Sequence, residues 1–285
     1  MKISEVNVAI LDNDGVLRRE GLQLPGVPEL YQAMDRLRIQ NVLLSNNSRV
    51  TSEGLVRQMQ KFGVSGFRRE QAMTSAEGAA AWIKEHPSTE RPEDMRVFAV
   101  GEEGVFQSLQ DVGLSLVNEQ WDGKKWDPLP TDVVVGFDTK MDYATKMAPA
   151  WNAIRHGARW VHTNGDISYR NEAGEELPAN GAQLQYLSST GRQPAVVIGK
   201  QDIGMAEAAL HRMGQTKRQA HIAVIGDNPV EDMELAENLH KAGWKAEGWM
   251  VLTGVTTAEQ ASHLHVQRIF EDIRAVTQAL LSTER

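Results

Sequence analysis

Short apolar runs rich in β-branched residues alternate with segments of helical period along the chain. The first run, residues 6–11, is followed by residues 27–37, whose apolar positions fall on one face of a helix. A second strand-like run at 41–45 precedes a helical segment at 51–63, which ends in Gly63, a residue suited to a helix C-terminus.

The same alternation continues through the rest of the chain. Further strands are expected at 96–101, 132–137, 159–164, 194–199, 221–226 and 248–253. Further helices are expected at 104–113, 143–157, 204–214 and 230–243. Strands that alternate with helices predict an α/β fold with mostly parallel sheets.

Two polar segments, 84–95 and 118–132, carry Pro, Gly and charged residues and are expected to be surface connections. The second contains Trp121 and Trp126. We interpret both rings as anchors of a loop, with an exposed aromatic binding platform as the alternative.

Composition narrows the class of protein. With 285 residues, of which 41% are apolar, the chain can bury one large core or two smaller ones. The absence of cysteine excludes disulfides, thiol nucleophiles and cysteine-based zinc sites. The net charge of −8 argues against nucleic acid or an anionic membrane as a partner, but is compatible with a small anionic substrate. The N-terminal residues resemble neither a signal peptide nor a membrane span, so we expect a cytoplasmic protein.

Two carboxylates, Asp12 and Asp14, follow the first strand. Because side chains alternate along a strand, residues two apart point to the same side, so both carboxylates are expected to face one pocket while Asn13 turns away. Open parallel sheets bind ligands at the carboxyl ends of their strands, and Mg²⁺ would relieve the repulsion between two close acids. The alternative is an acidic turn closed by Gly15.

Hydroxyl and amide groups follow the second strand, at Ser45, Asn46, Asn47 and Ser48. Such donors near a helix N-terminus suit phosphate oxygens. A capping turn for the next helix is the more frequent explanation of such a cluster.

Two later strands also end in charged residues. Lys200 follows one and could neutralise an aspartyl nucleophile and a phosphoryl group, although a surface lysine is the alternative. Asp227 follows the other and could complete a Mg²⁺ site. Asp232 could act behind it, as a water-mediated ligand or as the partner of Lys200, a role that Glu231 could contest. The alternative is an acidic helix start favoured by the helix dipole.

Taken together and in this order, the four motifs resemble those of the haloacid dehalogenase (HAD) superfamily phosphatases. They are Asp12-x-Asp14, Ser45, Lys200 and Asp227 with Asp232. Further stretches resemble the NagD-like group, which contains the p-nitrophenylphosphatases and phosphoglycolate phosphatases. These stretches are 44–63, 74–83, 97–105, 133–138, 160–169 and 249–257.

The resemblance implies a domain organisation. In that group a large α/β cap is inserted between the second and third motifs, which here gives a cap at 75–193 and a Rossmann-like core at 1–74 and 194–285. Asn164 and Asp166 lie in a stretch similar to the cap segment that faces the core, which suggests contact with substrate; a turn after a strand is the alternative. Caps of this kind often pair, which suggests a homodimer through the cap.

The sequence departs from the group's pattern at three places. Asn13 stands where an apolar residue is usual, Gln201 stands where proline is usual, and residues 227–232 read DNPVED in place of a Thr-Asp ending. None of these departures removes a residue that the chemistry requires. We therefore expect activity, on an unusual substrate.

The resemblance implies a Mg²⁺-dependent phosphomonoesterase. Asp12 would attack phosphorus to form an aspartyl-phosphate, and Asp14 would act as general acid and then general base. Asp12, the backbone carbonyl of Asp14 and Asp227 would hold Mg²⁺. The phosphoryl oxygens would be bound by Ser45, Asn46, Asn47 and Lys200.

Other functions share parts of this pattern. A phosphotransferase would use the same groups, a dehalogenase would not need Asp14, and a non-catalytic relative with the same fold would be expected to lack Asp12 or Asp14. A receiver-type signalling domain would be far shorter. The substrate is expected to be a small phosphorylated metabolite, and sugar phosphates, phosphoglycolate, glycerol phosphate, nucleotides and pyridoxal phosphate all suit relatives of this type.

Overall fold

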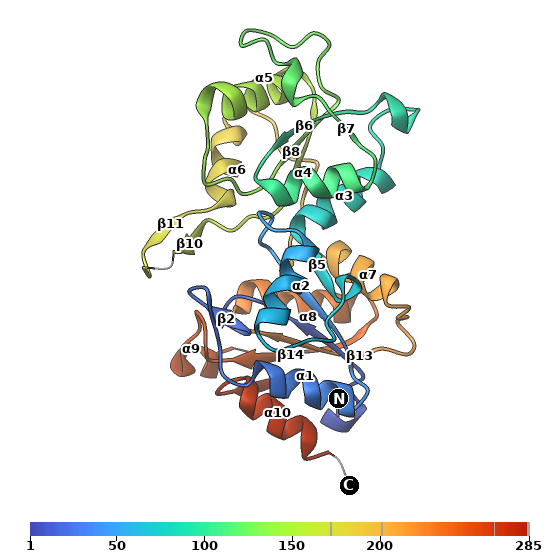
Figure 1. Ribbon diagram of the computed structural model, residues 1–285, viewed down its shortest axis with the longest axis vertical. Helices are drawn as coiled ribbons and strands as arrows, with labels where there is room; N and C mark the ends of the chain where they lie inside the picture. Colours follow the sequence, from blue (N-terminus) through green and yellow to red (C-terminus); the bar gives the residue numbers. More distant parts are fainter. Residues whose placement is uncertain (172, 201, 265, 284–285) are drawn as a thin grey trace. The chain divides into compact units, whose positions relative to one another are not determined.

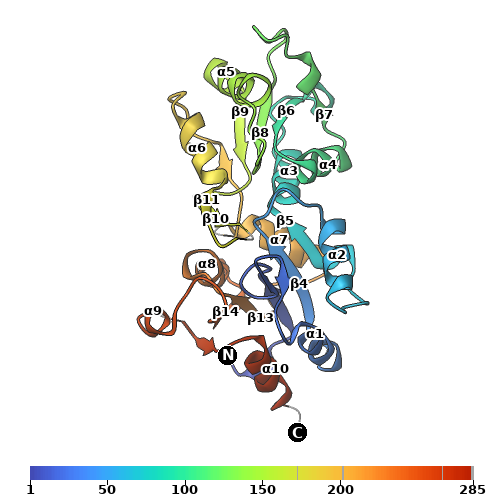
Figure 2. The ribbon, with the colours of Figure 1, turned by 60° about the vertical axis from the view of Figure 1, so that its left-hand side comes forward.

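The computed structural model describes residues 1–171, 173–200, 202–264 and 266–283, which form two compact units (Figures 1 and 2). Unit 1 consists of Met1–Ser45, Ser52–Met73 and Lys200–Arg285. Unit 2 consists of Asn46–Thr51 and Thr74–Gly199. Each unit is built on its own mainly parallel sheet, so the predicted α/β class is confirmed.

Unit 1 contains a six-stranded sheet in the order β15-β14-β13-β1-β4-β5. Its strands are β1 (Val8–Leu11), β4 (Gln40–Ser45), β5 (Ala72–Thr74), β13 (His221–Gly226), β14 (Lys245–Val251) and β15 (Arg268–Phe270). Its helices are α1 (Val27–Arg36), α2 (Ser52–Lys61), α7 (Ile203–Arg212), α8 (Glu234–Lys241), α9 (Ala258–Ser262) and α10 (Ile273–Leu281). Shorter elements are η1 (Ile3–Glu5), the β2–β3 hairpin (Arg18–Arg19, Leu22–Gln23), η2 (Arg69–Gln71) and the π-helix η6 (Pro229–Met233).

The continuous apolar run of β1 has a structural reason. This strand lies between β13 and β4, parallel to both, and all four of its residues are buried. A strand covered on both faces needs apolar side chains on both, which explains why the run does not alternate with polar residues. Helix α1 buries the face predicted from its sequence and packs against α10 (Figure 1).

Unit 2 contains a five-stranded parallel sheet in the order β12-β9-β8-β6-β7. Its strands are β6 (Arg96–Val100), β7 (Ser115–Leu116), β8 (Asp132–Val135), β9 (Arg159–His162) and β12 (Val196–Val197), with a separate hairpin of β10 (Ser168–Arg170) and β11 (Glu176–Pro178). Its helical elements are α3 (Ser75–Glu85), η3 (Pro92–Asp94), α4 (Glu103–Asp111), η4 (Asn118–Gln120), the π-helix η5 (Tyr143–Met147), α5 (Ala148–His156) and α6 (Asn180–Ser188).

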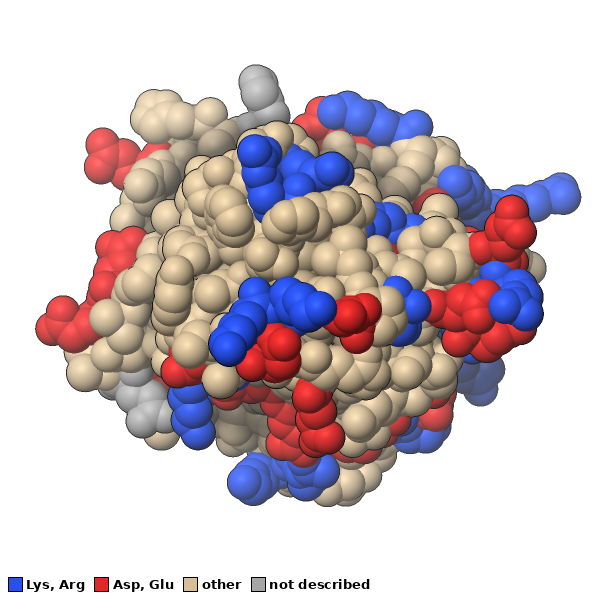
Figure 3. Space-filling view, turned by 90° about the horizontal axis from the view of Figure 1, so that it is seen from above, with Lys and Arg blue, Asp and Glu red and all other residues tan. Residues whose placement is uncertain are grey.

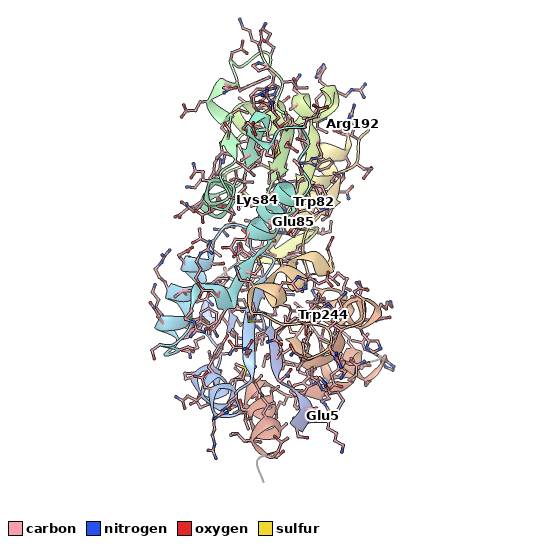
Figure 4. The ribbon with its side chains drawn as sticks, turned by 90° about the vertical axis from the view of Figure 1, so that its right-hand side faces the viewer. Glu5, Trp82, Lys84, Glu85, Arg192 and Trp244 are labelled. Atoms are coloured by element: carbon pink, nitrogen blue, oxygen red, sulfur yellow. The ribbon has the colours of Figure 1, made fainter. Side chains whose placement is uncertain are left out.

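Tryptophan rings anchor both units, as expected for Trp121 and Trp126. Trp126 is buried against Phe98 and donates its indole N–H to the carbonyl of Pro149 at 3.0 Å, while Trp121 packs beside it. Trp82 in unit 2 and Trp244 in unit 1 are marked in Figure 4. Trp244 is buried and donates to Glu207 Oε1 at 2.9 Å.

Charged side chains of both signs are interspersed on the face shown in Figure 3. Among the described residues, no helix is both long enough and apolar enough to cross a bilayer.

Candidate active site

Three aspartates from unit 1 come together at the carboxyl ends of neighbouring strands. Asp12 directly follows β1 and continues its ladder by donating its backbone N–H to the carbonyl of Ile225 at 3.0 Å. Asp227 directly follows β13, the neighbour of β1. Together with Asp232 of η6, each offers a carboxylate oxygen that lies within 4.8 Å of the others, and all three side chains are buried.

Local backbone geometry holds Asp232 in this group. The side chain of Asn228, which directly follows Asp227, caps η6 by accepting the backbone N–H of Val230, and the helix begins at Pro229. One oxygen of Asp232, Oδ2, then accepts the backbone N–H groups of Asp227 and Asn228 at 3.2 and 3.1 Å. The DNPVED sequence thus places the Asp232 carboxylate against the backbone at the carboxyl end of β13.

Lys200 provides the positive charge beside the three acids. Its Nζ lies 2.5 Å from Asp12 Oδ1, 2.9 Å from Asp232 Oδ1 and 3.9 Å from a carboxylate oxygen of Glu231. Only 3% of the Lys200 side chain is exposed, so solvent screens these interactions weakly. Gln201, the adjacent departure from the family pattern, lies outside the described residues.

Burial and mutual repulsion govern the protonation of the acids. Burial raises the pKa of Asp12 well above its usual range; Lys200 opposes this shift, while Asp232 and Asp227 add to it. Burial, together with the Asp232 charge, raises the pKa of Asp227 to about 6. Burial lowers the pKa of Lys200, but its acidic neighbours prevail and raise it well above the usual value. One ammonium therefore balances only part of the negative charge of three close aspartates.

Two loops enclose Asp227. Asp227 Oδ2 accepts the backbone N–H of Val255 at 2.8 Å, and the hydroxyl of Thr256 donates to the Asp227 carbonyl at 2.6 Å. On the other side, Gly15 has a positive φ of 83°, and a Cβ there would lie only 2.4 Å from the carboxyl carbon of Asp227. The site requires glycine at this position for both reasons.

The second acid of the first motif, Asp14, does not join the group of three. Its side chain is 57% exposed and accepts hydrogen bonds from Arg18 Nε and Nη2 at 2.8 and 3.2 Å. Strand β1 ends at Leu11, so the two-residue alternation expected to align Asp14 with Asp12 does not extend that far.

Asn13 is buried where the family usually has an apolar residue, and a second amide, that of Gln58, satisfies its hydrogen-bonding groups. Asn13 Oδ1 accepts a hydrogen bond from Gln58 Nε2 of α2 at 2.6 Å. Sequence reasoning missed Gln58, because no local signal links positions 13 and 58.

The remaining predicted residues fall into two sets. Ser45 ends β4 in unit 1 and is buried. Asn46, Asn47, Asn164 and Asp166 belong to unit 2. Asn47 Oδ1 accepts the backbone N–H of Arg49 at 3.0 Å, whereas Asn46 is hydrogen-bonded to the turn that carries Asn164 and Asp166.

Sequence reasoning also assigned no role to the loop after β14. Thr253 donates its hydroxyl to the Gly15 carbonyl at 2.5 Å, and Val255 and Thr256 hold Asp227. The signal was present, since this loop follows another strand of the same parallel sheet. Elsewhere in unit 1, a pocket of about 800 Å³ lies among His221, Glu237 and Lys245, and no predicted site residue is among its described lining.

Comparisons with known proteins are consistent with this geometry. Residues 9–115 match the family model of haloacid dehalogenase-like hydrolases, and residues 197–276 match a second model of the same kind. The chain is 30% identical to a 5′-nucleotidase of Bacillus subtilis over 251 residues, which is 88% of each chain.

Two solved structures extend the similarity to the whole fold. A p-nitrophenyl phosphatase from Archaeoglobus fulgidus is 27% identical with a TM-score of 0.81, and the match covers 96% of this chain and 99% of that one. A glycerol phosphate phosphatase from Mycobacterium tuberculosis, solved with magnesium, is 27% identical with a TM-score of 0.79, and the match covers 99% of this chain and 79% of that one.

Proposed function

The chain belongs to the haloacid dehalogenase-like hydrolases, in the NagD-like group of p-nitrophenylphosphatases and phosphoglycolate phosphatases, and from this premise we propose that it is a Mg²⁺-dependent phosphomonoesterase that uses Asp12 as its nucleophile. The observation that carries the proposal is the buried group of Asp12, Asp227 and Asp232 with Lys200 beside it. Relatives that act on nucleotides, glycerol phosphate and p-nitrophenyl phosphate support a small phosphate ester as substrate.

The donor set fits a hard divalent cation. Carboxylate oxygens are the ligands that Mg²⁺ prefers, and burial, together with the charges of the neighbouring aspartates, raises the pKa values of Asp12 and Asp227. Asp12, the backbone carbonyl of Asp14 and Asp227 would hold the ion, with Asp232 behind them. When bound, Mg²⁺ would neutralise charge on the phosphoryl group and on its attacking carboxylate.

Residues of this chain supply the nucleophile, the proton donor and acceptor, and the groups that bind phosphate. A carboxylate oxygen of Asp12 attacks phosphorus while the ester bond breaks, and Asp14 gives its proton to the leaving alkoxide. Asp14 then takes a proton from the water that attacks the aspartyl-phosphate, which releases phosphate and restores Asp12. Ser45, Asn46, Asn47 and Lys200 bind the phosphoryl oxygens.

Asp14 can reach this role only if its contact with Arg18 opens. The contact is an exposed ion pair, which is generally worth less than about 1 kcal/mol. Its loss therefore adds little to the barrier of the proton-transfer step.

The test is phosphate release from a panel of phosphomonoesters, with Mg²⁺ and with a chelator. We expect turnover that the chelator abolishes, a radiolabelled phosphoenzyme after acid quench, and at least a thousandfold loss of turnover in Asp12→Asn. Unchanged turnover in that variant would contradict nucleophilic catalysis by Asp12. Transfer of the phosphoryl group to an added alcohol in preference to water would favour the phosphotransferase alternative.

We also propose that unit 2 mediates a homodimer. Met141, Tyr143 and Tyr186 supply exposed apolar surface on this unit, with 51%, 69% and 38% of their surfaces accessible. Sedimentation velocity tests this proposal: we expect a dimer that Tyr143→Glu dissociates, and a wild-type monomer at micromolar concentration would contradict it.

A further inference from the structure

The turn after β9 holds the segment that follows β4. Asn164 Nδ2 donates to the backbone carbonyl of Asn46 at 2.8 Å, and Asn46 Nδ2 donates to Asp166 Oδ1 at 3.2 Å. Within the turn, Asn164 Oδ1 accepts the backbone N–H of Asp166 at 3.2 Å. Side chains and backbone of the two segments are therefore joined in both directions.

Residues at the N-terminus of α6 donate hydrogen bonds to the turn after β9. Asn180, which is fully buried, donates through Nδ2 to Thr163 Oγ1 at 3.0 Å and to the Asn164 carbonyl at 3.3 Å. The backbone N–H of Gly181 donates to the carbonyl of Asp166 at 2.7 Å. These hydrogen bonds fix the turn to α6, so the turn can support the segment at Asn46 that it contacts.

Other contacts fix the same segment to unit 2. Ser48 Oγ accepts the backbone N–H of Phe137 at 2.8 Å, and Arg49 forms an ion pair of 3.1 Å with Glu102. The hydroxyl of Ser75 donates to the Asn46 carbonyl at 2.7 Å, alongside the amide of Asn164. The carbonyl of Asn46, the first residue after Ser45, thus accepts hydrogen bonds from two side chains.

The turn also adjoins the segment that leads to Lys200. Gly199 has φ of +145°, and a Cβ there would lie 3.4 Å from Asn46 Oδ1 and 3.6 Å from Asn164 Cβ. Asn46 directly follows Ser45, and Gly199 directly precedes Lys200. Chain neighbours of Ser45 and Lys200, two of the four proposed phosphate-binding residues, therefore meet at the turn.

We propose that Asn164 and Asp166 are positioning residues, which set the backbone on which Ser45 and Lys200 are carried, and that they act on phosphate affinity rather than on the choice of leaving group. This inference rests on the proposed function. Phosphate recognition requires donors held within about 0.5 Å of their productive positions, so a loosened support weakens binding of any ligand with a phosphoryl group. A residue that contacts the leaving group would affect only those substrates that reach it.

Inorganic phosphate separates the two roles because it has no leaving group. We would measure its dissociation constant by calorimetry in the presence of Mg²⁺, and its inhibition constant where turnover is present. The variants are Asn164→Ala, Asp166→Ala and the conservative Asp166→Asn. Ser168→Ala is the matched control, since it removes a polar contact of the same unit, to Glu176 on the exposed hairpin.

We expect the two alanine variants to bind inorganic phosphate about tenfold more weakly, the loss expected for one or two hydrogen bonds, and to raise KM by the same factor for every ester of the panel. Asp166→Asn, which keeps an acceptor for Asn46, should recover most of the affinity, and Ser168→Ala should match the wild type. Unchanged phosphate affinity with a KM that rises for some esters only would overturn the proposal.

Failure of the proposed function gives a different result. If the wild type binds inorganic phosphate but hydrolyses no ester, the phosphatase assignment fails while the calorimetric comparison of variants still decides the positioning role. If near-ultraviolet circular dichroism shows that an alanine variant is misfolded, Asn164→Asp provides the test. It keeps the side-chain size but replaces the donor to Asn46 with an acceptor, and native-like phosphate affinity in this variant would overturn the proposal.

Discussion

Acidification is expected to destabilise the protein through His162, the last residue of β9. This side chain is fully buried. Its Nδ1 accepts the indole N–H of Trp160 at 3.2 Å, and its Nε2 lies 3.0 Å from the carbonyl of Asn180. The neutral ring with hydrogen on Nε2 satisfies both partners, whereas a proton on Nδ1 would face the donor of Trp160. Burial lowers the pKa of His162 to about 4.

The magnitude follows from the difference between the pKa values of the folded and unfolded states. Between pH 6.5 and about 4 the unfolded chain binds a proton that the folded chain does not, so the free energy of unfolding falls as the pH is lowered through this range. At about 1.4 kcal/mol per pH unit, the loss from His162 is about 2 kcal/mol at pH 5 and about 3 kcal/mol below pH 4. Above pH 6.5 the contribution of His162 no longer depends on pH.

Urea unfolding of the wild type and of His162→Gln, at pH 7.5 and pH 5, measures this contribution. Glutamine keeps one donor and one acceptor but does not titrate, so the wild type should lose about 2 kcal/mol more than the variant between the two pH values. His156→Gln, at an exposed histidine of the same unit, is the matched control and should behave as the wild type. An equal pH dependence in the wild type and His162→Gln, or an imidazole NMR titration of His162 near pH 6.5, would refute the reasoning.

Three further predictions concern single side chains. Gln58→Leu should lower the free energy of unfolding by about 1–3 kcal/mol, because it leaves the buried amide of Asn13 without its hydrogen-bond partner. The double variant Asn13→Leu with Gln58→Leu should restore most of this loss, and a double variant no more stable than the single one would contradict the pairing. Trp126→Ala should cost about 3–5 kcal/mol in thermal or urea unfolding through the lost packing on Phe98, and a cost below 1 kcal/mol would show that the ring is dispensable. Asp14→Asn should lower kcat at least a hundredfold without changing the unfolding midpoint, whereas the control Arg18→Gln should keep kcat within about threefold. Equal losses of kcat in the two variants would argue that kcat depends on the ion pair and not on proton transfer by Asp14.

Most of the strands and helices that could be predicted were identified from apolar runs, from the helical spacing of apolar residues and from the residues that end each run. The runs that became β1, β4, β13 and β14 are buried on both faces, so their composition alone identified them. The hairpin of β10 and β11 was not predicted, because its short strands are largely exposed and lack alternation. Helix α6 was also missed, because few of its positions are apolar and its buried residues include the polar Asn180 and Gln183.

In the candidate site, the residues could be named, but not all of their partners. Asp12, Asp227 and Lys200 each stand at a strand end, and parallel strands bring such ends to one edge. The side-chain direction of Asp14 depends on where β1 stops, and the partner of Asn13 lies on a helix distant in sequence. Long-range hydrogen bonds of this kind leave no local pattern, and the same holds for the link between Asn46 and Asp166.

The path of the chain between the two units has a consequence for biosynthesis. Strand β1 emerges early from the ribosome, but its neighbour β13 begins only at His221, after all of unit 2 has been made. Until then β1, β4 and β5 form half a sheet with one side of β1 unpaired, while unit 2 already has every strand of its own sheet. Unit 2 is therefore expected to fold first during translation, and a chain truncated after Gly199 should leave an open β1 edge prone to aggregation.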